Sequence, residues 1–291
     1  MPKVSVIMNC LNGALYLREA IDSVYAQTFT DWEIIFWDNA STDESPVIAR
    51  SYDERIRYFR GPETVPLGKA RNLALDKAAG SLITFLDCDD IWCSDKLEKQ
   101  VGIMNSHPDI GFIYSNYYIK DELKHKQYPA IRDNGFQGMI FDAVLDRYRV
   151  GILTVMIRHE ILKFIDGYFD ESLTYASDYD LFLRILHDHQ ACYLPDHLAV
   201  YRLHEAMYGI TAYTKLDDEI VCVMEKFKRI YPNFENDHRK QLDNIQTRIR
   251  YSRTWQLMAK GDLKTVRTRH ELLHSGNIKL ITMYFASFMP V

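Results

Sequence analysis

The first half of the chain alternates short apolar segments with longer segments in which apolar residues recur at helical spacing. The short segments have the β-branched and aromatic content of buried strands and lie at residues 4–8, 32–37, 56–59 and 81–86. The helical segments follow them at residues 14–27, 43–52, 68–79 and 94–105. This strand–helix order predicts an α/β fold, an open and mostly parallel sheet with helices on both faces.

Periodicity weakens in the next part of the chain. Strands are predicted at residues 111–119 and 151–157, and between them residues 120–148 are charged and loop-rich, as expected beside a substrate site. A helix is predicted at residues 177–187. For the helix at residues 43–52, Ser41 or Thr42 is the expected cap.

The strand signals end before residue 215, and residues 215–275 combine helical periodicity with many charges. We therefore expect a main domain at residues 1–210, whose two halves meet near residue 119. Residues 211–291 are expected to form a helical C-terminal appendage.

Polar residues stand where three predicted strands end, which is where open α/β sheets bind their ligands. They are Asn9, Asp38 and the cluster of Asp87, Asp89 and Asp90. Three carboxylates within four positions repel one another unless a cation lies among them. Mg²⁺ and Mn²⁺ take oxygen ligands and combine one or two carboxylates with substrate phosphates. The cluster is either such a metal site or a solvated acidic turn before the next helix.

The composition of the chain limits the number of domains, the kinds of partner and the cellular location that we expect. The chain has 291 residues, 47% of them hydrophobic, enough for one large core with an appendage. The net charge of −5 argues against a nucleic-acid partner, which usually requires a basic excess. Five scattered cysteines and the lack of a signal-peptide pattern predict a reducing, cytoplasmic location.

The C-terminal tail, residues 278–291, places four large apolar residues on one helical face: Ile278, Ile281, Phe285 and Phe288. The tail is too short to span a bilayer. Either it lies in the membrane interface, which would make the protein peripheral at the inner face of the membrane, or it packs internally or against a second subunit as a homodimer.

A series of motifs, in this order along the chain, resembles family 2 glycosyltransferases of the GT-A fold. The motifs are the first strand and its loop at residues 4–12, the turn at 38–43, the helix start at 68–72, the Asp-x-Asp at 87–89, the paired segments at 167–171 and 177–181, and the Tyr-Arg-x-His at 201–204. The resemblance covers residues 3 to about 205. It implies the Rossmann-like fold of nucleotide-diphospho-sugar transferases, with a donor half at about residues 1–119 and an acceptor half at about 120–210.

The resemblance implies a nucleotide-sugar donor and names its binding residues as Asn9, Asn12, Asp38, Arg71 and Asp87. Asp38 stands where the family reads the nucleobase, and a carboxylate there accepts the uracil ring N–H, so a UDP-sugar is the implied donor. The alternative for Asp38 is a turn residue. Arg71 lies near a helix start, where a cation and the helix N-terminus suit a diphosphate.

The resemblance also implies a bound Mn²⁺ or Mg²⁺, which would stabilise the leaving diphosphate as a Lewis acid. The implied metal residues are Asp89, Asp90 and His204, and Asp87 would either hold the ribose or share the metal. Asp90 has an alternative role as a cap-like residue before the helix near Ser94. His204 has the alternatives of contacting the diphosphate or of packing only.

Asp178 is the predicted catalytic base, because the acceptor hydroxyl must lose a proton as it attacks the anomeric carbon. A single base opposite the leaving group implies inversion, by the stereochemical logic of inverting hydrolases. The alternative is an aspartate that stabilises a helix N-terminus. Asp180 is expected to be structural.

Several residues depart from the family pattern. Residues 9–12 replace Pro-Thr-Tyr-Asn, Asn39 and Ala40 replace Asp-Gly, and Ser177 replaces a glutamate. These changes affect nucleobase preference and acceptor geometry. The Gln-x-x-Arg-Trp motif of the processive synthases is absent from the sequence, so transfer of one sugar per encounter is expected.

The leading hypothesis is therefore an inverting, metal-dependent glycosyltransferase that acts on a glycan or a lipid-linked glycan in surface-glycan biosynthesis. A catalytically silent nucleotide-sugar-binding partner is one alternative, allowed by Ser177 and the altered first motif. A nucleotidyltransferase is the other, although residues 9–13 contain a single glycine where a Gly-rich phosphate loop would stand.

Overall fold

The computed structural model describes residues 1–165, 167–205, 213–259, 261–268 and 277–286. The chain divides into two compact units, residues 1–207 and residues 208–291. All the candidate site residues named above lie in the first unit.

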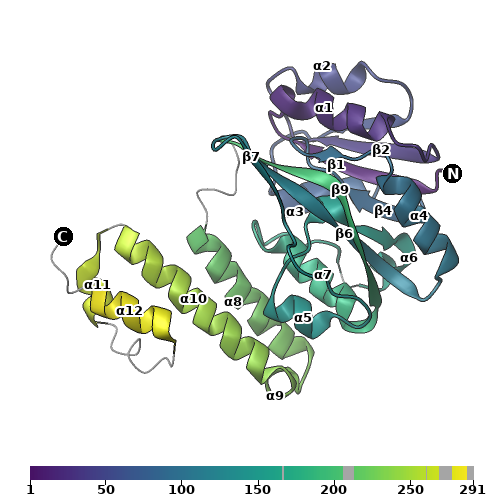
Figure 1. Cartoon of the computed structure of the whole chain (residues 1–291). Coiled ribbons are helices and arrows are strands. Elements are labelled where there is room, and N and C mark those ends of the chain that lie inside the picture. The colour runs from purple at the N-terminus through teal and green to yellow at the C-terminus, as the bar shows by residue number, and fades with distance from the viewer. Residues whose placement is uncertain (166, 206–212, 260, 269–276, 287–291) are drawn as a thin grey trace. The chain divides into compact units, whose positions relative to one another are not determined.

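A mixed sheet of nine strands forms the centre of the first unit (Figure 1). The strands are β1 (Val4–Cys10), β2 (Trp32–Asp38), β3 (Ile56–Arg60), β4 (Leu82–Phe85), β5 (Ile91–Trp92), β6 (Ile110–Asp121), β7 (Lys126–Pro129), β8 (Met156–Arg158) and β9 (Gln190–Leu203). Their spatial order is β3-β2-β1-β4-β8-β6-β9-β5, and β7 pairs with β6. The first four strands of that order run parallel, as the sequence predicts. β8 runs antiparallel to both of its neighbours, and β9 runs parallel to β6.

Side chains along β1 point alternately to the two faces of the sheet, and helices pack against both faces. Val4, Val6 and Met8 join a buried cluster with Leu17 of α1 and Leu97 of α4. Figure 1 shows α1 and α2 together on one side of β1 and β2, with α3 on the other. The helices of this unit are α1 (Ala14–Tyr25), α2 (Ser45–Arg50), α3 (Leu67–Leu75), α4 (Lys96–Ser106), α5 (Phe141–Asp146), α6 (His159–Phe164) and α7 (Ser177–Asp188), with a 3₁₀ turn, η1 (Ile152–Thr154).

The 14-residue strand β9 is the largest element that the sequence pattern did not reveal. Its pairing with β6 skips Pro195 and Asp196 where the register shifts between Ser115 and Asn116. Proline has no N–H to donate, so it is confined to edges and bulges of a sheet. The bulge and the partial burial of β9 remove the period-2 alternation by which a strand is recognised in a sequence.

Three other predictions need correction. Residues 120–148, expected to be loop-rich, contain the strand β7 and the helix α5. The strand expected at residues 151–157 begins as η1 and becomes β8 only afterwards. The helix expected at residues 43–52 is the shorter α2, which begins after Glu44 and has no side-chain cap from Ser41 or Thr42.

The second unit is helical throughout its described parts. Its helices are α8 (Tyr213–Ile230), α9 (Phe234–Asp237), α10 (Arg239–Ala259), α11 (Leu263–Thr268) and α12 (Ile278–Ala286). In the predicted tail, Ile278 is exposed. The side chains of Ile281 and Phe285, and residues 287–291 with Phe288, lie outside what the structure describes. Among the described helices, none combines the length and apolar character needed to cross a membrane.

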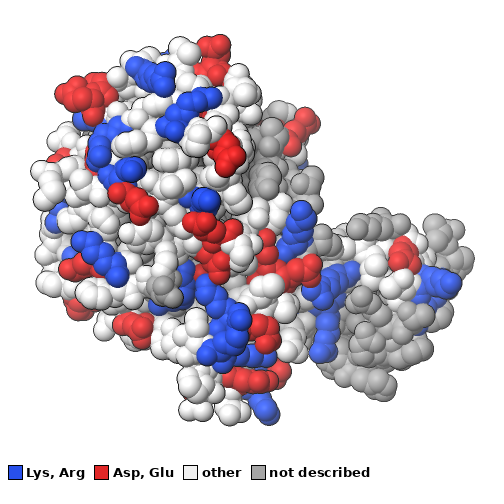
Figure 2. All heavy atoms as spheres, turned by 180° about the vertical axis from the view of Figure 1, so that it is seen from behind, with Lys and Arg blue, Asp and Glu red and all other residues white. Residues whose placement is uncertain are grey.

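Charges of both signs are interspersed on the face seen in Figure 2, where Lys and Arg lie among Asp and Glu. Such a mixture is typical of a solvated protein surface. Exposed pairs such as Lys99 with Asp95, 2.8 Å apart, contribute little to stability. Buried charges are therefore expected to affect stability more than these exposed pairs do.

Lys96 is a fully buried cation that joins the two strands flanking the acidic residues 87–90. Its Nζ donates to Oγ1 of Thr84, on β4, at 3.1 Å and to Oε1 of Gln100 at 2.7 Å. The same nitrogen lies 4.1 Å from the ring centroid of Trp92, on β5. Burial lowers the pKa of Lys96 well below its usual value.

We expect a comparison of the wild type with Lys96→Met to reveal this lowered pKa. Methionine has an unbranched side chain of similar length but lacks the ammonium group. A folded-state pKa below the unfolded one means that the ammonium destabilises the fold at neutral pH. This penalty fades as the pH rises toward the unfolded pKa of about 10.4. The free energy of unfolding of the wild type, relative to Lys96→Met, should therefore increase between pH 7 and pH 9.5 in urea titrations.

The control for loss of a lysine charge is Lys126→Met, at an exposed position on β7. A difference between wild type and Lys96→Met that stays constant with pH would contradict the prediction.

Candidate functional site

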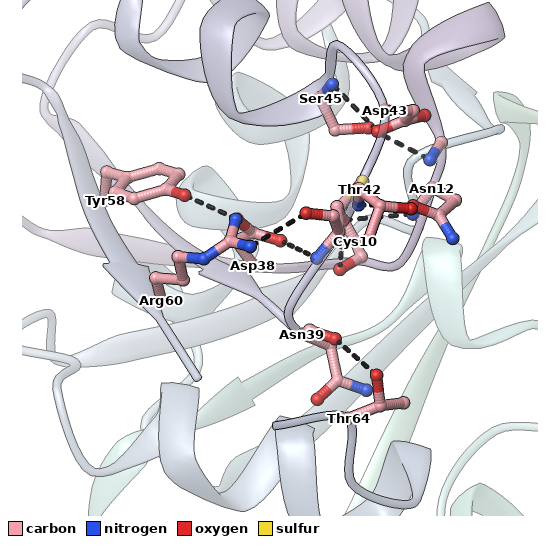
Figure 3. Close-up of polar contacts among 12 residues, drawn as sticks. Cys10, Asn12, Asp38, Asn39, Thr42, Asp43, Ser45, Tyr58, Arg60 and Thr64 are labelled. Atoms are coloured by element: carbon pink, nitrogen blue, oxygen red, sulfur yellow. Dashed lines mark hydrogen bonds and ion pairs between the residues drawn. The ribbon is translucent and has the colours of Figure 1, made fainter. Parts of the chain in front are cut away.

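Asp38, at the carboxyl end of β2, is held by donors from β3 and from the following turn (Figure 3). Its side chain is fully buried. The Tyr58 hydroxyl and the Arg60 guanidinium each donate to Oδ2 at 2.5 Å, and the Ser41 N–H donates to Oδ1 at 2.8 Å. Burial raises the pKa of Asp38, but these bonds outweigh burial and hold the pKa below its usual value.

The bonds to Asp38 also limit what else it can bind. A carboxylate oxygen accepts about two hydrogen bonds, so Tyr58 and Arg60 occupy Oδ2. Oδ1, which accepts the Ser41 N–H, keeps one acceptor site. The turn role considered for Asp38 is therefore real, and its predicted contact with a nucleobase depends on Oδ1.

The loop after β1 is tied to the turn after β2 through Asn12. Its N–H donates to Oγ of Ser41 at 3.0 Å, and its Oδ1 accepts the Thr42 N–H at 2.8 Å. Ala40, in the position where the family has glycine, has a φ of 64°. A left-handed backbone at a residue with a Cβ costs about 1–2 kcal/mol. Ala40 therefore adopts the left-handed backbone conformation that a glycine would adopt in this turn.

Two asparagines line the same strand ends with different roles. Asn39 bonds the backbone of Val65 in both directions, donating from Nδ2 to the carbonyl at 2.8 Å and accepting the N–H at Oδ1 at 3.1 Å (Figure 3 shows Asn39). An aspartate there lacks the donor for the first bond. Asn9 is 7% exposed, and its Nδ2 has no hydrogen-bond partner among the described residues. Asn9 thus offers an unused donor at the end of β1.

Arg71 of α3 is buried and binds the first aspartate of the acidic cluster. Its Nη2 lies 3.0 Å and 3.1 Å from the two oxygens of Asp87. The guanidinium carbon lies 5.4 Å from the ring centroid of Phe169. Two of the five residues that the resemblance assigned to the nucleotide, Arg71 and Asp87, are therefore an ion pair.

Asp89 and Asp90 point to different partners. Oδ2 of Asp89 lies 3.1 Å from Nε2 of His204. Oδ1 of Asp90 accepts the backbone N–H of Arg202 at 3.0 Å, so Asp90 anchors β9 and is not a cap for α4, whose N-cap is Asp95. Burial raises the pKa of both carboxyls, and the charges of the neighbouring aspartates raise them further.

Arg202 links the acidic cluster to the rest of the first unit. Its side chain is 4% exposed, and its Nε donates to the Asp89 carbonyl at 2.9 Å. Its Nη1 donates to Glu122 at 2.7 Å and its Nη2 to Glu19 at 2.6 Å. The guanidinium carbon also lies 4.4 Å from the ring centroid of Tyr16. One side chain of β9 therefore joins the acidic cluster, α1 and the end of β6.

Asp178 lies in the first turn of α7, where a carboxylate interacts favourably with the helix dipole. Its Oδ1 accepts the Tyr179 N–H at 2.8 Å and its Oδ2 accepts the Tyr148 hydroxyl at 2.7 Å. Burial raises the pKa of Asp178, while the charge of Arg71 and the Tyr148 hydrogen bond oppose that rise. Asp180 instead forms a buried ion pair with Arg184, which fits its expected structural role.

The negative charge of the acidic cluster is complementary to that of a divalent cation. Oδ2 of Asp90 is buried and has no hydrogen-bond partner in the part of the chain that the structure describes. Within that part, no three His, Cys, Asp or Glu side chains are gathered as a set of metal ligands. Mg²⁺ and Mn²⁺ sites that serve phosphorylated substrates often have only one or two protein carboxylates, since phosphate and water complete the shell. Asp89 supplies one such carboxylate, and the His204 imidazole lies beside it.

The sequence did not reveal several residues of this site, among them Tyr58, Arg60, Arg202 and Tyr148. Arg60 faces Asp38 in the register of β2 and β3, and both residues lie one position beyond the strands predicted at residues 32–37 and 56–59. Arg202 stood inside the Tyr-Arg-x-His motif without an assigned role. Tyr148 lies in the segment between α5 and η1, and nothing in its local sequence marks it.

We expect Arg202→Lys to destabilise the first unit by about 3 kcal/mol. A lysine has one ammonium group and cannot serve the carbonyl and both glutamates that the guanidinium fork serves, and breaking a buried ion pair costs about that much. Urea unfolding measures the change. Arg55→Lys is the matched control, because Arg55 forms an exposed pair with Asp53 and should cost less than about 1 kcal/mol. Equal losses in the two variants would contradict the role of Arg202.

Known proteins resemble this chain in sequence. Residues 5–163 match the family model of glycosyl transferase family 2. An uncharacterised glycosyltransferase of Rickettsia typhi is 33% identical over 222 residues, which are 75% of this chain and 69% of that protein. WfgD of Escherichia coli, named UDP-Glc:alpha-D-GlcNAc-diphosphoundecaprenol beta-1,3-glucosyltransferase, is 32% identical over 193 residues, or 64% of this chain and 70% of WfgD.

Solved structures share the fold. TarS 1–349 of S. aureus in complex with UDP-GlcNAc has a TM-score of 0.61 and 18% identity, covering 98% of this chain and 90% of TarS 1–349. The mannosyltransferase PcManGT of Pyrobaculum calidifontis, solved with GDP-Man and Mn²⁺, has a TM-score of 0.64 and 20% identity, covering 98% and 84%. These likenesses confirm the predicted GT-A fold. The family match, which spans more than half of the 291 residues, shows that this chain belongs to glycosyl transferase family 2 and is a glycosyltransferase.

Proposed function

We propose that the chain transfers one sugar from a UDP-sugar to an acceptor hydroxyl with inversion at the anomeric carbon. The observation that carries the proposal is the position of Arg71. Its guanidinium binds Asp87, and its charge opposes the rise in the pKa of Asp178 that burial causes. One buried cation therefore acts on both the carboxylate assigned to the nucleotide and the carboxylate assigned to proton transfer.

The donor nucleotide is proposed to bind across the ends of β1, β2 and β4. Asn9 supplies its unused Nδ2 donor, and Asp38 supplies the remaining acceptor site of Oδ1. Arg71 and Asp87 form the ion pair that follows β4, and Asn12 ties the loop after β1 to the turn after β2. Uracil is the proposed base, since a ring N–H donor matches the carboxylate of Asp38. TarS has been solved with UDP-GlcNAc and WfgD is named for UDP-Glc, which supports a UDP-sugar.

Mn²⁺ or Mg²⁺ is the proposed cofactor, and Asp89 and His204 are the residues that would hold it. Asp90 is the third candidate because its Oδ2 lacks a partner among the described residues. When bound, such an ion supplies Lewis-acid stabilisation to a leaving diphosphate. PcManGT, solved with Mn²⁺, supports this choice of metal.

Asp178 is the proposed base. A general base needs a pKa high enough to attract a proton and low enough to remain ionised before the reaction. Burial raises the pKa of Asp178, while Arg71 and Tyr148 keep the rise in check. With one base and a leaving group on the opposite face of the sugar, in-line displacement inverts the anomeric centre.

The proposed acceptor is a glycan or a lipid-linked glycan, since WfgD is named for a diphosphoundecaprenol-linked sugar. The C-terminal region, expected to be helical over residues 211–291, is proposed to contact a membrane surface or a second copy of the chain. Trp255 is 59% exposed and Ile278 is 80% exposed there, and such side chains suit either contact.

Donor binding is tested by thermal unfolding with UDP and Mn²⁺. A ligand that binds the folded state at about 100 times its Kd stabilises it by about 2.7 kcal/mol, which is a shift in Tm of roughly 5 °C or more. We expect this shift in the wild type only when UDP and Mn²⁺ are both present, and we expect it to disappear in Asp89→Asn.

Asp109→Asn, at an exposed aspartate outside the site, is the control and should keep the shift. A full shift in Asp89→Asn would refute the metal assignment. If no nucleoside diphosphate stabilises the wild type, the proposed donor site is wrong and the silent-partner hypothesis takes its place.

The base is tested with Asp178→Asn, which keeps the side-chain shape and removes the proton acceptor. General-base catalysis contributes about 10²–10⁴-fold, so we expect transfer from UDP-sugars to fall by at least about 10²-fold. The UDP and Mn²⁺ shift in Tm should remain. Asp188→Asn, at the other end of α7, is the matched control and should keep activity. Transfer at the wild-type rate in Asp178→Asn would remove Asp178 from the mechanism.

A further inference from the structure

Tyr148 lies between α5 and η1, and its hydroxyl donates to Oδ2 of Asp178 at 2.7 Å. The residue as a whole is 37% exposed, so its ring borders solvent while its hydroxyl is engaged with the carboxylate. We propose that Tyr148 is a positioning residue for the catalytic base, holding the carboxylate of Asp178 in the orientation that receives the acceptor proton. This inference rests on the proposed role of Asp178.

The hydrogen bonds to Asp178 fix the carboxylate at both ends. Oδ1 accepts the Tyr179 N–H at 2.8 Å, and Oδ2 accepts the Tyr148 hydroxyl. With one bond to each oxygen, rotation of the carboxylate about its terminal torsion breaks at least one of them. Each oxygen keeps a second acceptor site for a hydroxyl proton. The backbone bond is built into α7, so Tyr148 is the side chain that completes the orientation.

Tyr148 is itself held by its neighbours. Its ring packs edge-on against the ring of Tyr179, with centroids 5.0 Å apart and planes at 68°. The Tyr179 hydroxyl donates to the carbonyl of Leu145, in α5, at 3.1 Å. The next residue, Arg149, forms an ion pair with Asp133. These contacts hold the segment that carries Tyr148 against α7 before any acceptor arrives, as preorganised catalysis requires.

The charges around Asp178 favour a protonated, donating Tyr148. Burial and the charge of Asp178 raise the pKa of Tyr148 well above its usual value, so the phenol keeps its proton. From α3 the base faces the Arg71 cation, and from β6 it faces Tyr117. From its own helix it receives the Tyr179 N–H. The Tyr148 hydroxyl and Arg71 both stabilise the ionised carboxylate, and removing the hydroxyl should make Asp178 easier to protonate.

The experiment is a pH titration of the Asp178 carboxyl carbon by ¹³C NMR in the full-length protein. Asp178→Asn assigns the signal. Tyr148→Phe removes only the hydroxyl, and we expect the midpoint of the titration to move to higher pH. Tyr52→Phe is the matched control, because Tyr52 also donates to an aspartate, Asp22, at 2.6 Å, but outside the site. A midpoint in Tyr148→Phe equal to those of the wild type and of Tyr52→Phe would overturn the proposal.

Activity separates this inference from the proposed function on which it rests. With UDP-GlcNAc as donor and water as acceptor, released UDP is followed from pH 5 to pH 9. We expect Tyr148→Phe to lose about tenfold or more at the acidic end and less at the alkaline end, because a hydrogen bond to a charged group is worth about that factor. A loss equal at every pH would mark a merely structural tyrosine and refute the positioning role.

If Asp178→Asn retains wild-type turnover, the base assignment itself fails and the role of Tyr148 fails with it. If Asp178→Asn is inactive and Tyr148→Phe keeps the wild-type pH profile, only the role of Tyr148 fails.

Discussion

Repulsion among the carboxylates of Asp87, Asp89 and Asp90 is the constraint on which the rest of the site depends. Each carboxylate receives a partner from a different part of the chain. Asp87 pairs with Arg71 of α3, Asp89 with His204, and Asp90 with the backbone of Arg202. A buried charge without such a partner costs several kcal/mol. The acidic loop can therefore be stable only when α3 and β9 are in place around it.

This requirement gives the end of β9 a structural role. The strand runs along β6 for most of its length and delivers Arg202 at its end. The guanidinium reaches Glu122 and Glu19 and supports the carbonyl of Asp89. The hydrogen bond from Arg202 holds the pKa of Glu122 at about 2, so that carboxylate stays ionised in the pH range of any assay. The two halves expected of the main domain are thus joined electrostatically at the acidic cluster.

The sequence predicted the parts of this structure that depend on local pattern. The strands β1 to β4 and the helices between them repeat a simple alternation, and their parallel order follows from it. The motif resemblance led to Asp87, Asp89 and Asp178, and the structure shows the contacts of each. β9 was missed because its bulge at Pro195 breaks the period-2 pattern.

Other contacts could not be predicted from the sequence for a different reason. The bond from Tyr148 to Asp178 joins residues 30 positions apart, and the bond from Arg202 to Glu19 joins residues 183 apart. Neither bond leaves a periodic or compositional trace, because it depends on how α5, α7 and β9 pack in three dimensions. Asp38 shows the same limit. Its position at a strand end was predictable, whereas the saturation of Oδ2 by Tyr58 and Arg60 was not.

The electrostatics of Asp178 bring these elements together. Burial alone would raise the pKa of this carboxyl and leave it protonated over more of the pH range, which a base cannot tolerate. Full neutralisation by a close ion pair would leave it too weak to take a proton. Arg71 gives its hydrogen bonds to Asp87 and acts on Asp178 through its charge, which opposes the rise in pKa that burial causes. The cation that binds Asp87 thereby also opposes protonation of Asp178, the proposed base, and the neutral hydroxyl of Tyr148 supplies the direct bond.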